Sequence, residues 1–315
     1  MSSRPQSSTV PVTPAGAVAI WLRAVRAPSL SATFAPCLAV GLYGVGAEWA
    51  IAPLTTLLAA VGVLAVQLGV NLLNDVEDDA RGIDRPGTLG GSGVIQAGAL
   101  SAAAIRRAAW IAFAIGALAG LPAVIAHPER AGLVAVAALG AWGYSSGPGL
   151  KYRALGDVAV LALCGPVLTV GFALAAFGRV DVGVVGLGLA FGWAAVGILH
   201  VNNFQDMEVD AGRGARTVAL ALGRTGSRAY LVAVYALALA SWPIVAAAIG
   251  LSWPVVIVPV VATLPVGSLL RRLLRASARD LDGLQAPALA LVRVDAAKAH
   301  LALGAAIALG LALSL

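Results

Sequence analysis

Long apolar segments fill almost the whole chain and leave only short polar loops between them. About 20 mostly apolar residues are enough to cross the hydrocarbon core of a bilayer. Nine such stretches can be marked, near residues 29–46, 52–73, 108–126, 131–147, 155–178, 183–204, 229–250, 253–270 and 287–314. The sequence is 60% hydrophobic and 11% charged, with a mean hydropathy of +0.90, unlike a soluble domain. We therefore expect an all-α, polytopic membrane protein with about nine transmembrane helices.

The basic residues indicate how these helices are oriented. Of the 21 Lys and Arg residues, 17 precede the first span or lie in every second loop after it. By the positive-inside rule, the N-terminus and these loops are cytoplasmic and the C-terminus lies outside. Residues 1–15, rich in Ser, Thr and Pro, are expected to be a disordered tail, and residues 16–315 a single transmembrane domain.

Two polar stripes interrupt the apolar pattern, and both fall on the predicted cytoplasmic side. The first follows the second span and contains Asn71, Asn74, Asp75 and Asp78. At 3.6 residues per turn these four positions share one helix face, where the helix leaves the bilayer. Ionisable groups at the ends of apolar helices are costly, so they are candidates for function.

The second stripe follows the sixth span and has the same chemistry. Asn202, Asp206 and Asp210 are spaced by four residues and form one face. Each stripe runs into an Arg-Gly pair, Arg81-Gly82 or Arg213-Gly214. The recurrence indicates a divergent duplication in which two four-helix halves surround a central cavity, with a ninth helix added.

The residue types in the stripes favour a hard cation. Asp and Asn oxygens without a Cys or His cluster suit Mg²⁺, which is usually held by one or two carboxylates plus substrate phosphates. An isoprenoid diphosphate fits such a place, because its tail needs an apolar groove and its head needs cations at the interface. Lys151, Arg153 and Arg216 lie in predicted cytoplasmic loops and are candidates to bind the diphosphate, and spacing does not choose among them.

Other classes of protein share some of these features. A secondary transporter also combines intramembrane carboxylates with repeats, but its charges usually lie near the midplane, whereas these cluster at one face. A non-catalytic isoprenoid-binding scaffold would be expected to lack the carboxylates. Nucleic acid is not expected as a partner, because the basic residues follow the loop alternation. His200, beside the second stripe, is interpreted as structural rather than as a base.

The stripes resemble the aspartate motifs of the UbiA superfamily of intramembrane prenyltransferases. Asn74, Asp75 and Asp78 match its NDxxD pattern, and Asp206, Asp210 and Gly214 match DxxxDxxxG. Within the superfamily the chain is most similar to the 1,4-dihydroxy-2-naphthoate prenyltransferases. The segments that carry this likeness are Arg81-Gly82-Ile83-Asp84, Leu89-Gly90-Gly91-Ser92-Gly93, Asn202-Asn203, Arg216-Thr217 and the loop from Tyr144 to Gly156. Ala215 and the pair Arg26-Ala27 depart from that branch, which often has Lys and Arg-Pro at these places.

The resemblance implies the roles of individual residues. Asn74, Asp78, Asp206 and Asp210 would bind Mg²⁺, the three aspartates would be catalytic, and Lys151, Arg153 and Arg216 would hold the diphosphate. Further candidates are Asn71, Asp75, Arg81, Asp84, Tyr144, Asn202 and Asn203.

The resemblance also implies a reaction. An isoprenyl diphosphate would ionise, and an aromatic acceptor such as 1,4-dihydroxy-2-naphthoate would attack the allylic cation, in quinone biosynthesis at the cytoplasmic membrane. Relatives with similar motifs use other acceptors or are membrane terpene cyclases, which ionise the donor without an acceptor. Both remain alternatives.

Overall fold

The computed structural model describes residues 16–85, 91–275 and 287–315. The expected tail of residues 1–15, together with Leu89 and Gly90, lies outside these ranges. The regular elements described are all helical, apart from one backbone bridge between Arg153 and Arg216. In chain order they are α1 (Ala17–Ala24), η1 (Ala27–Leu30), α2 (Ser31–Gly46), α3 (Pro53–Ala80), α4 (Ala102–Ala126), η2 (Pro128–Arg130), α5 (Ala131–Ser145), η3 (Leu150–Tyr152), α6 (Gly156–Ala162), η4 (Leu163–Val167), α7 (Leu168–Phe177), α8 (Val182–Gln205), α9 (Met207–Gly212), α10 (Val218–Ala248), α11 (Trp253–Ile257), η5 (Val258–Ala262), α12 (Thr263–Arg275) and α14 (Pro287–Ala312).

Seven helical segments in the described part of the chain are long and apolar enough to cross a membrane. They are Pro53–Ala80, Ala102–Ala126, Gly156–Phe177, Val182–Gln205, Val218–Ala248, Trp253–Arg275 and Val292–Ala312. Two other expected spans form α2 and α5, of 16 and 15 residues, which are shorter than the usual crossing length. The polytopic all-α fold is confirmed, and the count of nine spans is not.

Side-chain caps fix the starts of several long helices. The hydroxyl of Ser101 accepts from the backbone N–H of Ala104 at the start of α4, and Asp181 accepts from Val184 at the start of α8. Each cap satisfies a backbone donor that has no partner within its helix. Such caps define where a helix begins.

Helix α8 lies at the centre of the bundle and α4 at its edge. In the most apolar 18-residue stretch of α8, 67% of the residues are buried, against 6% in the corresponding stretch of α4. Helix α8 packs against α6, η4, α10 and α14. The contact with η4 is close because Gly165 and Gly188 meet there, and a Cβ on Gly165 would lie 2.6 Å from the Gly188 carbonyl oxygen. The segment that carries the second stripe is therefore held on several sides.

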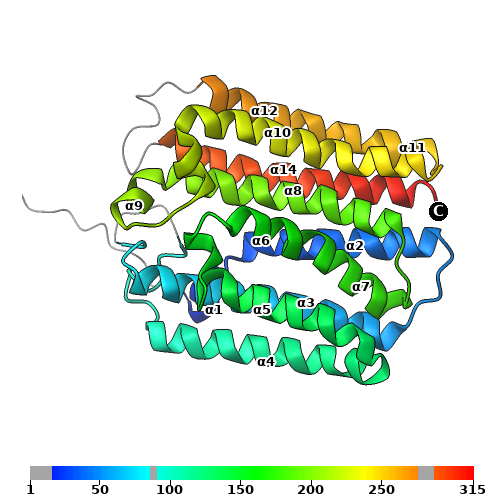
Figure 1. The fold of residues 1–315 in the computed structure, drawn as a ribbon, viewed down its shortest axis with the longest axis horizontal. Helices are drawn as coiled ribbons and strands as arrows, with labels where there is room; N and C mark the ends of the chain where they lie inside the picture. The colour runs from blue at the N-terminus through cyan, green and yellow to red at the C-terminus, as the bar shows by residue number, and fades with distance from the viewer. Residues whose placement is uncertain (1–15, 86–90, 276–286) are drawn as a thin grey trace, which may run out of the picture.

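The long helices run roughly side by side, and the C-terminal ends of α3 and α8 lie at the same end of the bundle (Figure 1). Both run toward the end of the bundle where α9 lies, and the C-terminus lies at the opposite end. The two stripes, about 130 positions apart in the sequence, are thereby placed at the same end of the molecule. The orientation relative to the two sides of a membrane stays a prediction, as does the single domain over residues 16–315.

Candidate active site

A cavity of about 960 Å³ lies between the helices and has one polar and one apolar part. Its polar part is lined by side chains from both stripes and from the segments beside them, namely Arg23, Arg26, Asn71, Asn74, Asp78, Asp84, Tyr144, Lys151, Asn202, Asn203, Asp206, Asp210 and Arg293. Its apolar part runs along α3, α4, α5 and α7, as far as Leu58 on α3. From Asn74 to Leu58 the helix rises about 24 Å, most of the thickness of a hydrocarbon core.

The first stripe divides between the cavity and the protein interior. Asn71, Asn74, Asp75 and Asp78 are all buried on α3, as the helical spacing predicts. Asn74 and Asp78 line the cavity. Asn71 lines it too, but its amide is used to donate to the carbonyl oxygen of Val25 and to the hydroxyl of Ser29, each at 2.9 Å. Asn71 therefore anchors the segment around η1 to α3.

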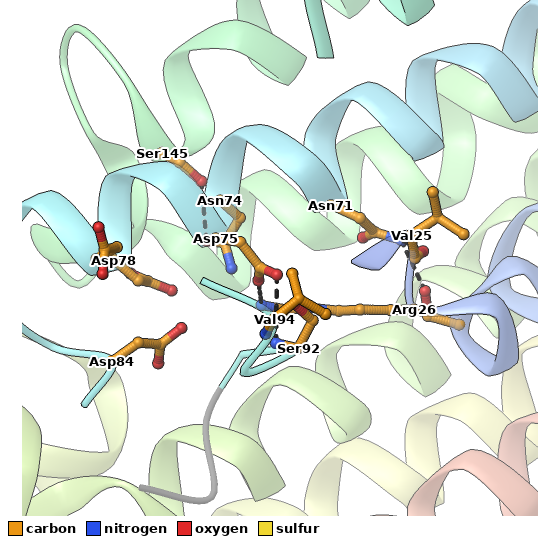
Figure 2. A network of polar contacts seen from close by, with 12 residues as sticks. Val25, Arg26, Asn71, Asn74, Asp75, Asp78, Asp84, Ser92, Val94 and Ser145 are labelled. Carbon is orange, nitrogen blue, oxygen red and sulfur yellow. Dashed lines mark hydrogen bonds and ion pairs between the residues drawn. The ribbon is translucent and has the colours of Figure 1, made fainter. Parts of the chain in front are cut away.

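Asp75 turns away from the cavity and holds two other segments in place. One of its oxygens is paired with the guanidinium of Arg26, and the other accepts from the backbone N–H of Ser92 at 3.3 Å (Figure 2). The side chain of Asp75 is 3% exposed and does not line the cavity. Its position suits a structural anchor that joins the start of η1, α3 and the loop after α3.

Asp78 is held from the loop that follows α5. Lys151 Nζ lies 2.5 Å from Asp78 Oδ2 and 2.7 Å from Asn74 Oδ1, and the Tyr152 hydroxyl donates to Asp78 Oδ1 at 2.8 Å. Ser145 also donates to Asn74, at 3.0 Å (Figure 2). An ammonium group is thus enclosed by the same two oxygens that were expected to bind a metal.

The second stripe reaches the cavity at the junction of α8 and α9. Asn202, Asn203, Asp206 and Asp210 all line it. Burial, and then the charge of Asp206, raise the pKa of Asp210 to about 7, and burial also raises the pKa of Asp206. Carboxylates whose charged form is penalised in this way bind a cation favourably once it is present.

Asp84 adds a carboxylate from the loop after α3. It is 6% exposed, lines the cavity, and has no partner for Oδ2 among the described residues. Burial, and then the charge of Asp78, raise the pKa of Asp84 to about 7. Gly91 packs directly on this carboxylate with a φ of +64°, and a Cβ at that position would collide with Oδ2.

The three basic candidates for diphosphate binding are placed differently. Lys151 lines the cavity, whereas Arg153 and Arg216 are exposed and are not part of its wall. The backbones of these two arginines are joined instead, since Ala154 N–H donates to the Arg216 carbonyl at 2.6 Å and Arg216 N–H donates to the Tyr152 carbonyl at 3.1 Å.

Three further residues have clear surroundings. Arg81 lies over the ring of Tyr152, with its Cζ atom 4.2 Å from the ring centroid, outside the cavity wall. Tyr144 lines the cavity. His200 is fully buried outside the wall, with Nδ1 3.2 Å from Asp157 Oδ2. That placement favours the structural interpretation of His200.

Tyr152, Ser145 and Arg26 contact the stripe residues, but the sequence did not indicate them as candidate site residues. Tyr152 follows Lys151 directly, but nothing in the spacing shows that its hydroxyl reaches Asp78, 74 positions earlier. Arg26 lies 49 positions before Asp75. Arg26 is one of three Arg residues near the start of the sequence, with Arg4 and Arg23, and this group is equally consistent with a topology signal.

The donor set fits Mg²⁺ if a substrate completes it. Among the described residues, no three His, Cys, Asp or Glu side chains lie together as a self-contained metal site. The oxygens of Asn74 and Asp78 do converge on one cation, the Lys151 ammonium. Asp206 and Asp210 line the same cavity from α8 and α9. Mg²⁺ commonly uses one or two carboxylates and takes its remaining ligands from phosphates and water.

These features together define a class of protein. The chain is an integral membrane protein whose helices enclose a cavity, with carboxylates from two helix ends at one end of it and an apolar channel beyond. Such a cavity suits an amphiphilic, anionic substrate.

Comparisons with known proteins identify the family. The sequence pattern of the UbiA prenyltransferase family matches residues 33–285, so the chain belongs to this family and is a prenyltransferase. It is 31% identical over 213 residues to a 1,4-dihydroxy-2-naphthoate octaprenyltransferase of Mycobacterium tuberculosis, covering 66% of this chain and 71% of that one. It is 34% identical over 210 residues to UbiA prenyltransferase domain-containing protein 1 of Gallus gallus, covering 65% of this chain and 62% of that one.

Solved structures support the same fold. A UbiA homologue from Archaeoglobus fulgidus, solved with GPP and Mg²⁺, has a TM-score of 0.62 at 14% identity. The match covers 91% of this chain and 99% of that one.

Proposed function

We propose that this prenyltransferase moves an isoprenoid chain from its diphosphate to an aromatic acceptor, 1,4-dihydroxy-2-naphthoate or a close analogue, with Mg²⁺. The observation that carries the proposal is the placement of carboxylates from α3, α8 and α9 around the polar end of one cavity whose remainder is apolar. The relatives named for the naphthoate reaction support this choice of acceptor.

Different residues of the cavity would bind the diphosphate head and the isoprenoid tail of the donor. Asn74, Asp78, Asp206 and Asp210 would hold Mg²⁺, and the ion would supply positive charge for the departing pyrophosphate. Lys151 adds a fixed positive charge on the Asp78 side. The apolar walls of α3, α4, α5 and α7 receive the isoprenoid tail and keep water away from the allylic cation.

The reaction balances without a further co-reactant. The bond between C1 and oxygen of the donor breaks, and its electron pair leaves with pyrophosphate. A ring carbon of the acceptor forms a new bond to C1. In the naphthoate case the carboxylate leaves that ring carbon as carbon dioxide, and its electron pair restores the aromatic ring.

Pyrophosphate release by the purified protein in detergent tests the proposal. Geranyl, farnesyl and geranylgeranyl diphosphates are supplied with Mg²⁺ or EDTA, with and without 1,4-dihydroxy-2-naphthoate. We expect release to need Mg²⁺ and the naphthoate, and to fall about 100-fold in Asp78→Asn and Asp206→Asn. Asp79→Asn is the matched control, because Asp79 accepts from Gln96 at 3.0 Å outside the cavity wall.

Each other outcome has a definite meaning. Release without any acceptor would replace the proposal with a terpene cyclase. Release with a different aromatic acceptor alone would keep the transferase and reject the naphthoate. Loss of activity in Asp79→Asn equal to that in Asp78→Asn would contradict the assignment of the cavity as the active site.

A further inference from the structure

The cavity has a strip of neutral polar side chains that the proposed metal site does not use. Gln67 on α3, Thr33 on α2 and Ser29 in η1 all line the cavity. At 1.5 Å per residue, Gln67 lies about 10 Å along α3 from Asn74, on the way to Leu58 in the apolar part. Covering unpaired polar groups with hydrocarbon costs free energy, so an isoprenoid tail alone is a poor ligand for this strip.

A chain of hydrogen bonds fixes the direction of the amide groups in the strip. The carbonyl of Val25 can only accept, and Asn71 Nδ2 donates to it and to Ser29 Oγ, each at 2.9 Å (Figure 2). Asn71 Oδ1 must therefore accept, and Gln67 Nε2 donates to it at 3.1 Å. Gln67 Oε1 then accepts from the hydroxyl of Thr33 at 3.2 Å. One main-chain carbonyl thus sets the orientation of an amide one helical turn further along α3.

This orientation leaves one hydrogen-bond donor of Gln67 unused. An amide nitrogen carries two hydrogens, and Asn71 accepts only one of them. The other has no acceptor among the described residues, and the Gln67 side chain is half-buried and lines the cavity. Interhelical hydrogen bonds often join membrane helices, but the link from α2 to α3 uses Oε1 alone. Helix packing therefore does not account for the second N–H.

A ring hydroxyl of the acceptor matches this donor. In the proposed reaction the acceptor ring must lie beside C1 of the donor, just beyond the diphosphate and its metal ligands. The strip lies at that level, since Asn71 is one turn beyond Asn74 and Gln67 is one turn beyond Asn71. An aromatic, hydroxylated ligand needs an apolar wall with a few fixed polar groups. In 1,4-dihydroxy-2-naphthoate the hydroxyl at ring position 1 bonds to the adjacent carboxylate, which leaves the hydroxyl at position 4 for the protein.

We propose that Gln67 Nε2 donates a hydrogen bond to the hydroxyl at ring position 4 of the acceptor and so selects acceptors that carry it. The inference rests on the proposed function and assigns a contact to its acceptor. Gln67 binds and orients the ring and takes no part in breaking the donor bond. Thr33 and Asn71 are positioning residues, which hold the Gln67 amide in this orientation.

A binding experiment with two ligands and three proteins isolates this contact. Wild type, Gln67→Met and Thr55→Val are titrated in detergent, under reducing conditions, with 1,4-dihydroxy-2-naphthoate and with 1-hydroxy-2-naphthoate, which lacks the hydroxyl at position 4. Methionine is similar in length to glutamine but has no N–H. Thr55→Val is the matched control, because the Thr55 hydroxyl joins α3 to the carbonyl of Ala175 at 2.6 Å, outside the cavity wall.

The preference of each protein for the dihydroxy ligand is the decisive result. Wild type should bind it about tenfold more tightly than the monohydroxy ligand, as expected for one hydrogen bond. The preference should disappear in Gln67→Met and persist in Thr55→Val. A residue that only joined helices would lower the melting temperature and weaken both ligands equally. A preference retained in Gln67→Met, or lost to the same extent in Thr55→Val, would overturn the inference.

Geranyl diphosphate with Mg²⁺ is the second probe, because the donor enters the same cavity. Its affinity should be the same in Gln67→Met as in wild type, and thermal denaturation checks that the variant is folded. A loss as large as that for the dihydroxy ligand would assign Gln67 to the donor and overturn the inference. The two naphthoates can also be compared on wild type alone, where equal affinities would overturn it without any variant.

Failure of the inference and failure of the proposed function give different results. If wild type transfers the isoprenoid to the dihydroxy ligand but binds both naphthoates equally well, only the inference is wrong. If the preference depends on Gln67 yet nothing is transferred to the naphthoate, the hydroxyl site stands and the transfer reaction is wrong.

Discussion

Replacing Lys151 with methionine tests the polar end of the cavity most directly. Lys151 and Asp78 have side chains that are 17% and 4% exposed, and Nζ contacts both Asp78 and Asn74. Removing one partner of a buried ion pair leaves the other charge uncompensated, which typically costs about 3–5 kcal/mol. Because the Tyr152 hydroxyl still donates to Asp78, we expect the lower end of that range, a loss of about 3 kcal/mol in the free energy of unfolding without metal.

The same substitution should change the response to Mg²⁺. In the wild type, the Lys151 ammonium lies between the two oxygens that we assign to the metal. Without it, Mg²⁺ has no competing cation and should bind the folded protein more tightly. A ligand that binds only the folded state raises the free energy of unfolding. The increase grows with the logarithm of the ratio of ligand concentration to Kd. Mg²⁺ should therefore stabilise Lys151→Met more than wild type, while transfer activity falls because the diphosphate loses a fixed charge.

Thermal denaturation in detergent, with EDTA and then with increasing Mg²⁺, measures both effects. Arg153→Met is the matched control, since Arg153 is a nearby basic residue that is exposed and outside the cavity wall. The reasoning is refuted if Lys151→Met is as stable as wild type in EDTA and responds to Mg²⁺ in the same way. It is also refuted if the control reproduces the full effect.

Three further predictions concern the metal, the tail and the core. Burial raises the pKa of Asp210 to about 7, and a metal ligand must be deprotonated, so stabilisation by Mg²⁺, measured by thermal denaturation, should grow as the pH rises through 7. Without metal the sign is opposite, because the folded state holds that proton more tightly than the unfolded state and loses stability as the pH rises toward 7. Gly120→Leu fills open space in the apolar channel, so turnover of long-chain donors should fall about tenfold while geranyl diphosphate still reacts; equal rates for both would contradict this. Asp157→Asn should cost about 1–3 kcal/mol in a denaturation experiment, because His200 loses its charged partner in the core; an unchanged midpoint would show that this contact is unimportant.

The sequence is sufficient to predict which helix ends line the cavity. Apolar length marks the spans, and the spacing of Asn74, Asp78, Asp206 and Asp210 marks the faces that line the cavity. These are local properties, because residues one turn apart on a helix must share a face. Similar chemistry in the two stripes is enough to suggest that they meet.

Contacts between distant segments are not predictable in the same way. Asp75 belongs to the same stripe as Asp78, yet it faces Arg26 and Ser92 rather than the cavity. Lys151 and Arg153 are two positions apart, yet the Lys151 side chain lines the cavity and the Arg153 side chain is exposed at the surface. Which side chain faces inward depends on packing between segments, and composition and periodicity do not predict that packing.

The backbone bridge beside the site has a consequence for how this part of the chain can vary. The bonds from Ala154 N–H and Arg216 N–H join the loop that carries Lys151 to the loop after the second stripe, and neither bond involves a side chain. We therefore expect positions 153 and 216 to accept many different residues without a change in the spacing between the two loops. Proline is the exception at 154 and 216, because it has no N–H to donate. Main-chain hydrogen bonds maintain the spacing of the two loops, so a comparison of side-chain identities alone would not reveal that this spacing matters.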